Sequence, residues 1–535
     1  MARVELTETS ALEVAAGLLA VPVWEEDLSG ALRGILSELD ARLGGHLSST
    51  VKEECFGGKS GEFLVMSTLG QLGASRLALT GLGRRADLPE LARGGHEALR
   101  MAAGKVARAA QQAGVTALAL ALGDGLDGPG AARAAVEGAL LGAYRFDRYR
   151  PKEAAKPALR TVRLALAAGR ASPELEAAVR LGERVAAAVA WARDLVNEAP
   201  RDCTPERLAR AAQEVARAGR LRCEVLGPKE IAALGMGMFQ GVTRGSAEEP
   251  RLVKVTWMPK GPAAAAPPLV LVGKAITFDS GGLSLKPTDS MVTMNGDMAG
   301  SAAVLATMRV VAELAPPFPV HALLGACENM PGGKAYKPSD VLTAYDGKTV
   351  EITNTDAEGR LVLGDVLAWA VDTLAPGALV DLATLTGACM VGLGNFTAGA
   401  FGQDGAAIEA VLAAAGAAGE DVWRLPLVPA VKDSLKSDVA DLKNTGERWG
   451  GAIAAAHFLK EFVGETPWAH VDIAGPAHAS KERGYIGKGG TGMGVRTLVE
   501  LVRAWSPPPA AARPAERAAP RRKKARPGAT ARRGR

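Results

Sequence analysis

The chain has 535 residues, 48% hydrophobic and 4% aromatic, enough for two or three domains with cores rich in Ala, Leu and Val. Its five cysteines are odd in number, widely spaced and without a C-x-x-C pair. This excludes a disulfide scaffold and is typical of a reducing cytoplasm. The net charge of +5 is local, because residues 506–535 carry ten basic residues and one Glu, a net +9, which leaves the rest at −4.

Two apolar stretches are candidates for an export signal or a membrane span, and neither fits. Acidic residues at Glu5, Glu8 and Glu13 lie in and before the first apolar stretch, which is not typical of a secretory signal. The longest charge-free run, 382–403, contains five glycines and indicates a strand and a glycine loop rather than a membrane span. We therefore expect a cytoplasmic protein without membrane contact.

The first 150 residues alternate between strand and helix patterns, which predicts a mostly parallel α/β sheet. His46 and His96 stand alone, and the stretch after His96 lacks the second histidine of a zinc-protease helix. No catalytic group is therefore predicted here. Hydrophobic periodicity predicts strands at 18–23, 62–66, 76–80, 117–122 and 160–167, and helices at 28–43, 88–113 and 131–141.

A long amphipathic helix is predicted over 173–198, where proline at position 200 stops it. Thr204 and Pro205 then form an N-cap and a first-turn proline that open a helix to about residue 218. From Leu269 onward the pattern repeats strand, loop and helix. Strands are predicted at 269–272, 320–325, 349–352 and 378–383, and helices at 298–314 and 361–374.

Two charged stretches follow strands of this second region, at 273–297 and 354–361. Open α/β sheets place their ligands at the carboxyl ends of strands. Isolated charges are costly to bury, so they are normally paired or bound to metal. Any one of these residues could be a solvated turn residue, but four carboxylates together suit a pair of divalent cations. The seven charged residues are Lys274, Asp279, Lys286, Asp297, Asp356, Glu358 and Arg360.

The spacing of these stretches resembles a known family. Gly-Lys-x4-Asp-Ser-Gly-Gly, x-Lys-Pro, Met-x-x-Asp-Met and Asn-Thr-Asp-Ala-Glu-Gly-Arg-Leu occur in this order, between residues 273 and 361. They are similar to the motifs of the leucyl aminopeptidase (cytosol aminopeptidase) family of two-metal exopeptidases. The likeness also covers 423–427, 468–475 and 491–496, and so spans roughly 175–505.

The resemblance implies a two-domain α/β protein. We expect an N-terminal domain with a mixed sheet at 1–170 and a connecting helix at 171–200. A catalytic metallopeptidase domain, with a central sheet flanked by helices, is expected at 201–505, and a disordered basic tail at 506–535. The family assembles as a homohexamer whose active sites face an interior cavity, which would restrict substrates to short peptides.

The resemblance also implies a metal site. Asp279 and Glu358 would bridge two divalent ions, Mn²⁺ or Zn²⁺. Lys274 and Asp297 would complete one coordination sphere, and Asp356 the other. A lysine can bind a metal only when its amine is neutral, which is unusual. From the residues alone, Lys274 could therefore instead be an ammonium that pairs with Asp279.

Two further cations have implied catalytic roles. Lys286 would stabilise the developing oxyanion. Arg360 would hold a bicarbonate ion that acts as general base. The alternative for both is ordinary surface charge.

Six residues match those that line the family's pocket for the first side chain. An apolar pocket discriminates by only about 1–3 kcal/mol per methylene, so we expect a broad preference for Leu, Met and similar residues. One departure is Asn295-Gly296, where the family usually has a basic residue in Met-x-x-Asp-Met, and this puts metal affinity or substrate preference in doubt. The pocket residues are Met294, Asn354, Thr384, Leu385, Gly387 and Ala474.

Other functions are open to different degrees. A serine protease built on Ser280 would leave the 356–360 cluster unexplained, and the Gly-x4-Gly-Lys spacing of a phosphate loop is absent. The basic tail, with the run Pro520 to Arg526, could bind nucleic acid weakly and with strong salt dependence. It could equally be a solvated extension, because its Pro, Ala and Arg content cannot build a core.

Overall fold

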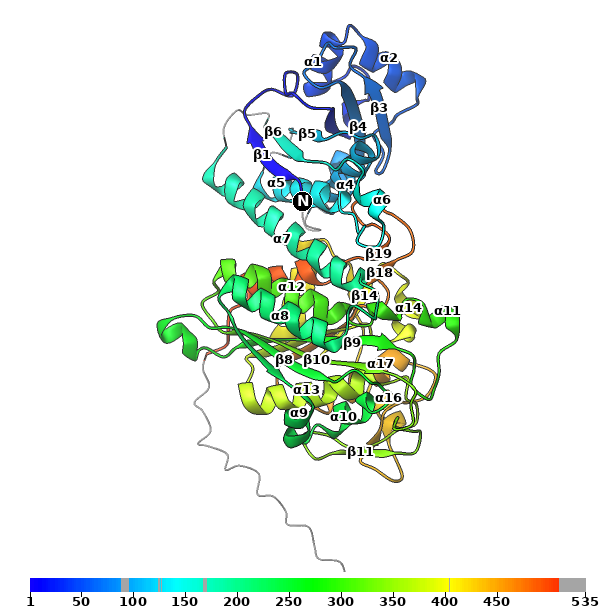
Figure 1. The fold of residues 1–535 in the computed structure, drawn as a ribbon. Helices are drawn as coiled ribbons and strands as arrows, with labels where there is room; N and C mark the ends of the chain where they lie inside the picture. Colours follow the sequence, from blue (N-terminus) through cyan, green and yellow to red (C-terminus); the bar gives the residue numbers. More distant parts are fainter. Residues whose placement is uncertain (88–95, 124–125, 127, 167–170, 404, 510–535) are drawn as a thin grey trace, which may run out of the picture.

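The computed structural model describes residues 1–87, 96–123, 126, 128–166, 171–403 and 405–509. These residues form two α/β domains, with the long helix α7 (Pro173–Asn197) between them (Figure 1). The predicted fold class is confirmed. Residues 510–535, which hold most of the predicted basic tail, lie outside the described residues.

The N-terminal domain is built on a six-stranded sheet with the order β1-β6-β5-β2-β4-β3. All neighbours are parallel except β3 and β4, so the sheet is mixed, as predicted. The strands are β1 (Arg3–Thr7), β2 (Leu18–Trp24), β3 (Phe63–Ser67), β4 (Arg76–Gly83), β5 (Ala117–Leu122) and β6 (Thr161–Leu166). The helices are α1 (Ile35–Arg42), α2 (His46–Glu53), α4 (Glu97–Gln112), α5 (Pro129–Gly142) and α6 (Pro151–Ala154).

Most predicted elements of this domain are confirmed, and the helix predicted at 28–43 is the main correction. Helix α1 begins only at Ile35, because Gly30 and Gly34 have φ values of +87° and +55° that a helix cannot accommodate. The edge strand β1 was not predicted. Of the helix predicted at 88–113, residues 88–95 lie outside the described residues, as does residue 167 of the strand predicted at 160–167.

Helix α7 has the predicted start and end. The Ser172 hydroxyl accepts a hydrogen bond of 3.2 Å from the Leu175 N–H, Pro173 occupies the first turn, and the helix ends three residues before Pro200. Its apolar side packs on α5 of the N-terminal domain and on α12 (Ala299–Leu314) of the second domain. It therefore belongs to the interface between the domains.

The second domain has an eight-stranded sheet with the order β15-β14-β17-β13-β9-β10-β8-β7. Strands β10, β9, β13 and β17 are parallel neighbours, so their carboxyl ends meet at one edge of the sheet. The strands are β7 (Arg222–Leu226), β8 (Arg251–Trp257), β9 (Leu269–Asp279), β10 (Val320–Asn329), β13 (Ala378–Ala383), β14 (Ala398–Gly402), β15 (Val422–Arg424) and β17 (Trp468–Asp472).

Helices cover both faces of this sheet (Figure 1). Helices α12, α8 and α18 pack on one face, and α13, α10 and α17 lie on the other. The helices are α8 (Pro205–Gly219), α9 (Pro228–Leu234), α10 (Gly237–Thr243), α11 (Thr288–Met291), α12, α13 (Gly359–Leu374), α14 (Gly387–Leu393), α15 (Ala406–Ala418), α16 (Pro429–Lys432), α17 (Gly451–Lys460) and α18 (Val495–Ala504). A small three-stranded sheet contains β11 (Val341–Thr343), β12 (Thr349–Glu351) and β16 (Leu442–Lys443). A two-stranded sheet contains β18 (His478–Ala479) and β19 (Gly489–Gly490).

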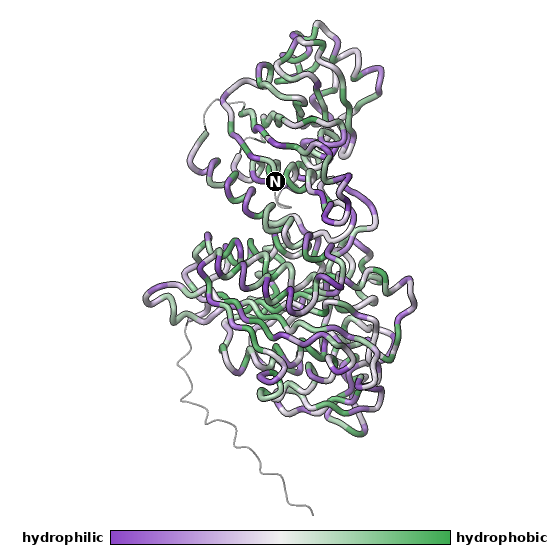
Figure 2. Tube along the Cα trace, in the orientation of Figure 1, coloured by the Kyte–Doolittle hydropathy of each residue, from purple (hydrophilic) through white to green (hydrophobic). Residues whose placement is uncertain are grey.

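Apolar residues are concentrated along the central strands and on the inner sides of the helices, as Figure 2 shows. Strand β9 is buried over almost its whole length, which explains its continuous apolar run before Lys274. Among the described residues, no helix combines the length and the apolar content that crossing a membrane requires.

Buried ion pairs link the two domains. Glu137 on α5 is fully buried and accepts hydrogen bonds from Arg100 Nε at 2.8 Å and from Arg133 Nε at 2.7 Å. Arg133 also contacts Glu500 on α18 of the second domain. Because removing one partner would leave an uncompensated buried charge, this network favours a fixed arrangement of the two domains.

We expect the protein to lose stability as the pH falls from 6.5 towards 4. His321 at the start of β10 is buried, with Nδ1 2.9 Å from the Thr256 hydroxyl. Burial, and then Lys254, lower the pKa of His321 to about 4 from its ordinary 6.5. Above pH 6.5 the imidazole is neutral in both the folded and the unfolded protein, and the fold has its full stability. Below pH 6.5 the unfolded protein binds a proton that the folded protein does not, so about 3 kcal/mol of the free energy of unfolding is lost by the time the pH reaches the folded-state pKa of about 4.

The urea unfolding midpoint between pH 4 and 7 measures this loss. His321→Gln should give a flatter pH dependence than the wild type, while the exposed His46→Gln serves as control and should follow the wild type. Parallel curves for the wild type and His321→Gln would contradict the assignment.

Candidate active site

The predicted charged residues meet at the carboxyl edge of the eight-stranded sheet. Asp279 is the last residue of β9, and Glu358 is the N-cap of α13. Asp297 lies just before α12, and Thr384 follows β13. Because these strands are parallel neighbours, stretches far apart in the sequence come together at this edge, as predicted.

A tight glycine turn follows Asp279. Gly281 and Gly282 both have left-handed backbones, with φ of +86° and +64°. A Cβ on Gly281 would lie 2.4 Å from the Ser284 carbonyl oxygen, so other residues are excluded sterically. The turn brings the Gly281 N–H to within 2.8 Å of Asp279 Oδ1 and directs the chain back towards Lys286.

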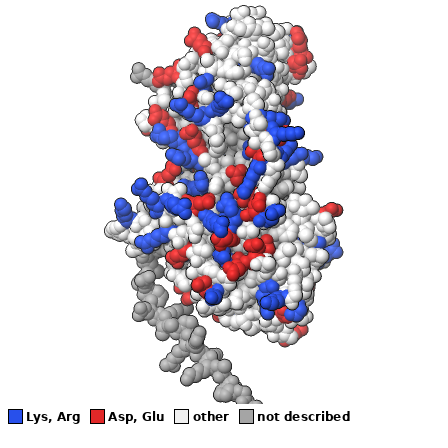
Figure 3. Space-filling view, viewed as in Figure 1, with Lys and Arg blue, Asp and Glu red and all other residues white. Residues whose placement is uncertain are grey.

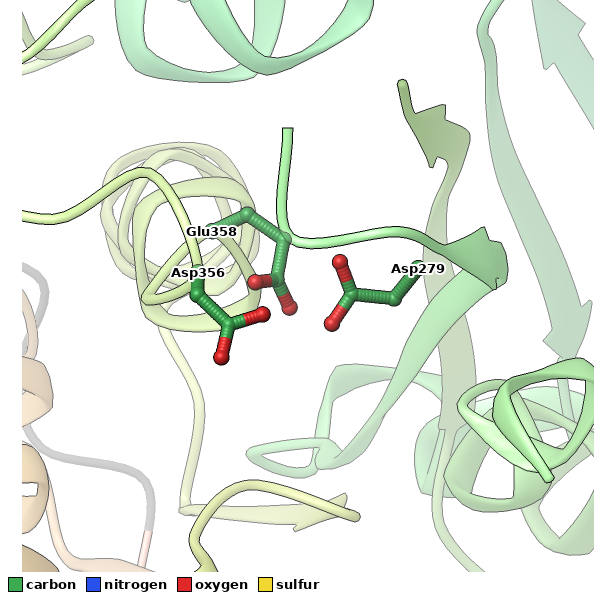
Figure 4. A group of neighbouring side chains, drawn as sticks. All are labelled: Asp279, Asp356 and Glu358. Carbon is green, nitrogen blue, oxygen red and sulfur yellow. The ribbon is translucent and has the colours of Figure 1, made fainter. Parts of the chain in front are cut away.

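Three carboxylates form the centre of the site. Asp279, Asp356 and Glu358 each offer an oxygen within 4.8 Å of the others, and Figure 4 shows their oxygens converging. Glu358 is 1% exposed, and its Oε2 has no hydrogen-bond partner among the described residues. Burial, and then repulsion from Asp279, raise the pKa of Asp356 and of Glu358. Oxygen-rich sets of this kind fit divalent cations.

Lys274 lies beneath this cluster and contacts the fourth carboxylate. Its Nζ is 2.8 Å from Asp297 Oδ2 and 3.0 Å from Glu358 Oε1, and it donates to the Thr384 carbonyl at 2.9 Å. Among the described residues, the Lys274 ammonium therefore pairs with Asp297 and Glu358 and not with Asp279, which was the alternative. Burial lowers the pKa of Lys274, but Asp297 and Glu358 outweigh it, so the pKa lies above its ordinary value in this arrangement.

Lys286 occupies the open side of the cluster. Its Nζ is 2.9 Å from Asp279 Oδ2 and also contacts Asp356 Oδ1. The side chain is 15% exposed, and the ammonium lines the cavity described below. Burial lowers the pKa of Lys286, but the nearby carboxylates of Asp279 and Glu358 raise it by more. The net pKa therefore lies above its ordinary value, and the group is cationic. The alternative of ordinary surface charge does not hold.

Arg360 is also buried rather than on the surface, at 8% exposure. Its Nη1 donates to the Asn444 carbonyl at 3.0 Å, whereas its buried Nε has no hydrogen-bond partner among the described residues. Burial lowers the pKa of Arg360 to about 10, which leaves it cationic at neutral pH. Arg360 lines the cavity described below, and a buried guanidinium with an N–H that lacks a partner among the described residues fits a small anion.

Asn329 and Tyr336 hold the two charged stretches together and were not predicted. Asn329 Nδ2 donates to Asp279 Oδ1 at 2.8 Å and to the Thr355 carbonyl at 3.0 Å. The Tyr336 hydroxyl donates to the same carbonyl at 2.7 Å. These bonds orient Asp279 and the loop of Asp356. No sequence signal indicated these roles, because Asn329 ends β10 four residues beyond the strand predicted at 320–325.

A cavity of about 1190 Å³ opens above these groups. All six predicted pocket residues line it. Two of them also support the charged cluster. Thr384 Oγ1 donates to Asp297 Oδ1 at 2.7 Å, and Asn354 Oδ1 accepts from the Asp356 N–H at 2.8 Å. The six are Met294, Asn354, Thr384, Leu385, Gly387 and Ala474.

Asn295, at the position where a basic residue was expected, has a structural contact. Its Nδ2 donates to the Val196 carbonyl at the end of α7, at 2.8 Å. It therefore ties the turn before Asp297 to the helix between the domains.

The N-terminal domain contributes to the cavity wall. Glu97 on α4 lines the cavity and pairs with Arg496 at 3.3 Å, next to Tyr485. No catalytic group was predicted before residue 150, and the place of Glu97 in the cavity wall was not predicted. On the face in Figure 3, acidic and basic side chains are interspersed where the two domains meet.

The motifs in this cavity agree with comparisons to known proteins. Residues 190–499 match the model of the cytosol aminopeptidase family, catalytic domain, and residues 20–153 match its N-terminal domain. A probable cytosol aminopeptidase of Geobacter sp. (strain M21) is 43% identical over 503 residues, covering 94% of this chain and 99% of the relative. One from Solibacter usitatus is 43% identical over 493 residues, covering 92% and 97%.

Solved structures agree with the sequence relatives. A mutant of tomato leucine aminopeptidase has a TM-score of 0.85 and 35% identity, covering 94% of this chain and 96% of that chain. The bottromycin maturation enzyme BotP in complex with Mn has a TM-score of 0.78 and 37% identity, covering 92% and 99%. Both domains, the carboxylate cluster and these similarities lead to one assignment: the chain belongs to the cytosol aminopeptidase family and is an aminopeptidase.

Proposed function

We propose that the protein uses two divalent metal ions, Mn²⁺ or Zn²⁺, to release N-terminal residues, preferentially Leu and other apolar residues, from short peptides. The observation that carries the proposal is the convergence of Asp279, Asp356 and Glu358 within 4.8 Å, with a buried Glu358 oxygen lacking a hydrogen-bond partner among the described residues. The BotP structure in complex with Mn supports metal binding at such a site.

The metal ligands follow from this cluster. By the resemblance to the family, Asp279 and Glu358 would hold both ions. Asp356 would complete one site, and Asp297 with Lys274 the other. Lys274 would have to lose its proton to act as a ligand, and a nearby dication favours the neutral amine.

Catalysis would combine the metals with two cationic side chains. When bound, a pair of divalent ions lowers the pKa of water and polarises the scissile carbonyl. Lys286, whose ammonium lines the cavity, would lie beside the developing oxyanion and stabilise it. Arg360 would hold bicarbonate as general base, and its free Nε supports an anion at that position.

The cavity lining supports a broad apolar preference. Met294, Leu385 and Ala474 offer apolar surface along the wall, and Gly387 leaves space beside them. Such a surface separates side chains by about 1–3 kcal/mol per methylene. We therefore infer a preference for Leu and Met over small or charged residues, without strict selectivity.

We also infer a homohexamer and a cytoplasmic location. Large apolar side chains are exposed around the cavity wall helix α14 and nearby loops, with Val391 at 90% exposure and Phe396, Trp423 and Trp449 also exposed. Clusters of exposed apolar residues mark protein interfaces. All five cysteines lie in the described residues as free thiols, which supports a reducing compartment. Analytical ultracentrifugation tests the assembly.

Hydrolysis of leucyl substrates tests the proposal directly. The purified protein should cleave a leucyl amide, lose this activity on exhaustive chelation and regain it with Mn²⁺ or Zn²⁺. Metal analysis should give two ions per chain. Activity that survives chelation and is lost to a serine-directed reagent would overturn the proposal.

Nucleic-acid binding through the tail remains a separate prediction. Deleting residues 506–535, which carry a net +9, should leave peptidase activity and assembly intact. It should remove most DNA retardation at low salt, since such binding releases phosphate counterions. Equal retardation by both forms would assign binding to the folded body, and none by either would end the hypothesis.

A further inference from the structure

The turn after β13 is held from two sides. On one side, the Thr384 carbonyl accepts from Lys274 Nζ at 2.9 Å, and the Thr384 hydroxyl donates to Asp297. On the other side, the Leu385 N–H donates to Asp472 Oδ1 at 3.1 Å. The turn thus spans the gap between the proposed metal ligands and the end of β17.

The carboxylate of Asp472 joins two segments of the pocket wall. Asp472 is fully buried. It is the last residue of β17 and is paired in register with Ala383 of β13. Its Oδ1 accepts from the N–H groups of Leu385 and Ala474, both at 3.1 Å. Its Oδ2 accepts from the Thr386 hydroxyl at 2.7 Å.

The bond to Thr386 extends this link into helix α14. The Thr386 hydroxyl also accepts from the Cys389 N–H at 3.0 Å, as the N-cap of α14. Helix α14 places Gly387 and Met390 on the cavity wall. One carboxylate therefore holds the turn, the start of a helix and the segment at Ala474 at once.

We propose that Asp472 is a positioning residue that sets the shape of the side-chain pocket and thereby the preference for the first residue of the substrate. The inference rests on the proposed function. Asp472 does not line the cavity, so it acts through Leu385, Thr386 and Ala474. A carboxylate is suited to the task because it only accepts hydrogen bonds and meets three donors here.

The test compares Asp472→Ala with Asp472→Asn. Alanine removes the acceptor of three donors, the buried Thr386 hydroxyl and the half-buried N–H groups of Leu385 and Ala474, so the two segments should separate. The ratio of kcat/KM for leucyl over alanyl substrates should fall at least about tenfold, chiefly through KM. Asparagine keeps one carbonyl oxygen and should restore most of the ratio. Thr386→Val removes one of the three donors together with the N-cap of α14 but keeps both N–H bonds to Asp472, so it should give a smaller change than alanine.

Asp365→Ala is the matched control. Asp365 is also fully buried and accepts from two backbone N–H groups, of Phe239 and Tyr345, each at 2.8 Å. It does not line the cavity. Its loss should lower stability but leave the leucyl to alanyl ratio unchanged. Metal content at saturating Mn²⁺ should stay at the wild-type level in all four variants.

Hydrogen exchange provides a readout without substrate. Asp472→Ala should speed amide exchange in peptides that cover 384–389 and 473–476, and Asp365→Ala should not. If Asp472→Ala does not fold, Asp472→Asn and Thr386→Val carry the comparison. Unchanged exchange and an unchanged ratio in folded variants would overturn the inference. Faster exchange in a protein whose wild type cleaves no aminoacyl substrate would instead overturn the proposed function and leave the positioning role in place.

Discussion

Replacing Asp279 or Glu358 by alanine is expected to abolish peptide hydrolysis and to remove bound metal. Both carboxylates are buried members of the cluster, and each is proposed to hold both ions, so losing one weakens both sites. Loss of an outer-shell partner alone typically lowers metal affinity or activity about 10–100-fold. The loss of a bridging ligand should therefore exceed about a hundredfold in kcat/KM, with metal content falling well below two ions per chain.

Asp289→Ala is the control for this result. Asp289 lies on the short helix α11, close in sequence to the site but exposed and outside the cavity lining. It should retain both metal and activity. Metal analysis after dialysis, with leucyl amide hydrolysis on the same samples, measures the difference. Full metal occupancy in both Asp279→Ala and Glu358→Ala would refute the bridging assignment.

The sequence was informative where local chemistry decides the structure. The apolar run before Lys274 predicted β9, and the proline and threonine at 204–205 predicted the start of α8. It failed at 28–34, where Gly30 and Gly34 interrupt an otherwise periodic pattern. Local sequence patterns therefore predicted most helices and strands. The start of α1 was the exception, because the backbone conformations of two glycines set it.

The site could be predicted only in part, for a topological reason. The motif spacing identified the charged residues, because they are adjacent to strand ends. The contacts of Asn329 and Asp472 depend on the strand order β10-β9-β13-β17, which places distant segments side by side. Glu97 was missed because its role depends on the packing of one domain against the other. No local pattern encodes such contacts.

Lys286→Ala is expected to keep the metals while turnover falls. The Lys286 ammonium contacts Asp279 and Asp356, but its proposed partner in catalysis is the oxyanion of the substrate. Its removal leaves all proposed metal ligands in place. Loss of one oxyanion-stabilising donor typically costs about 10²–10³ in kcat, and we expect a loss of this size with two ions still bound.

The exposed Lys337→Ala controls for the loss of a lysine charge, since Lys337 pairs only with Asp340 at the surface among the ion pairs of the described residues. It should behave as the wild type. Steady-state kinetics and metal analysis on the same preparations separate the two roles of Lys286. A fall in metal content parallel to the fall in kcat would make Lys286 a structural partner of the carboxylates. Normal kcat with full occupancy would remove it from catalysis. Only reduced kcat with both ions bound agrees with an ammonium that acts on the transition state, because an interaction made only there lowers kcat without weakening the metal site.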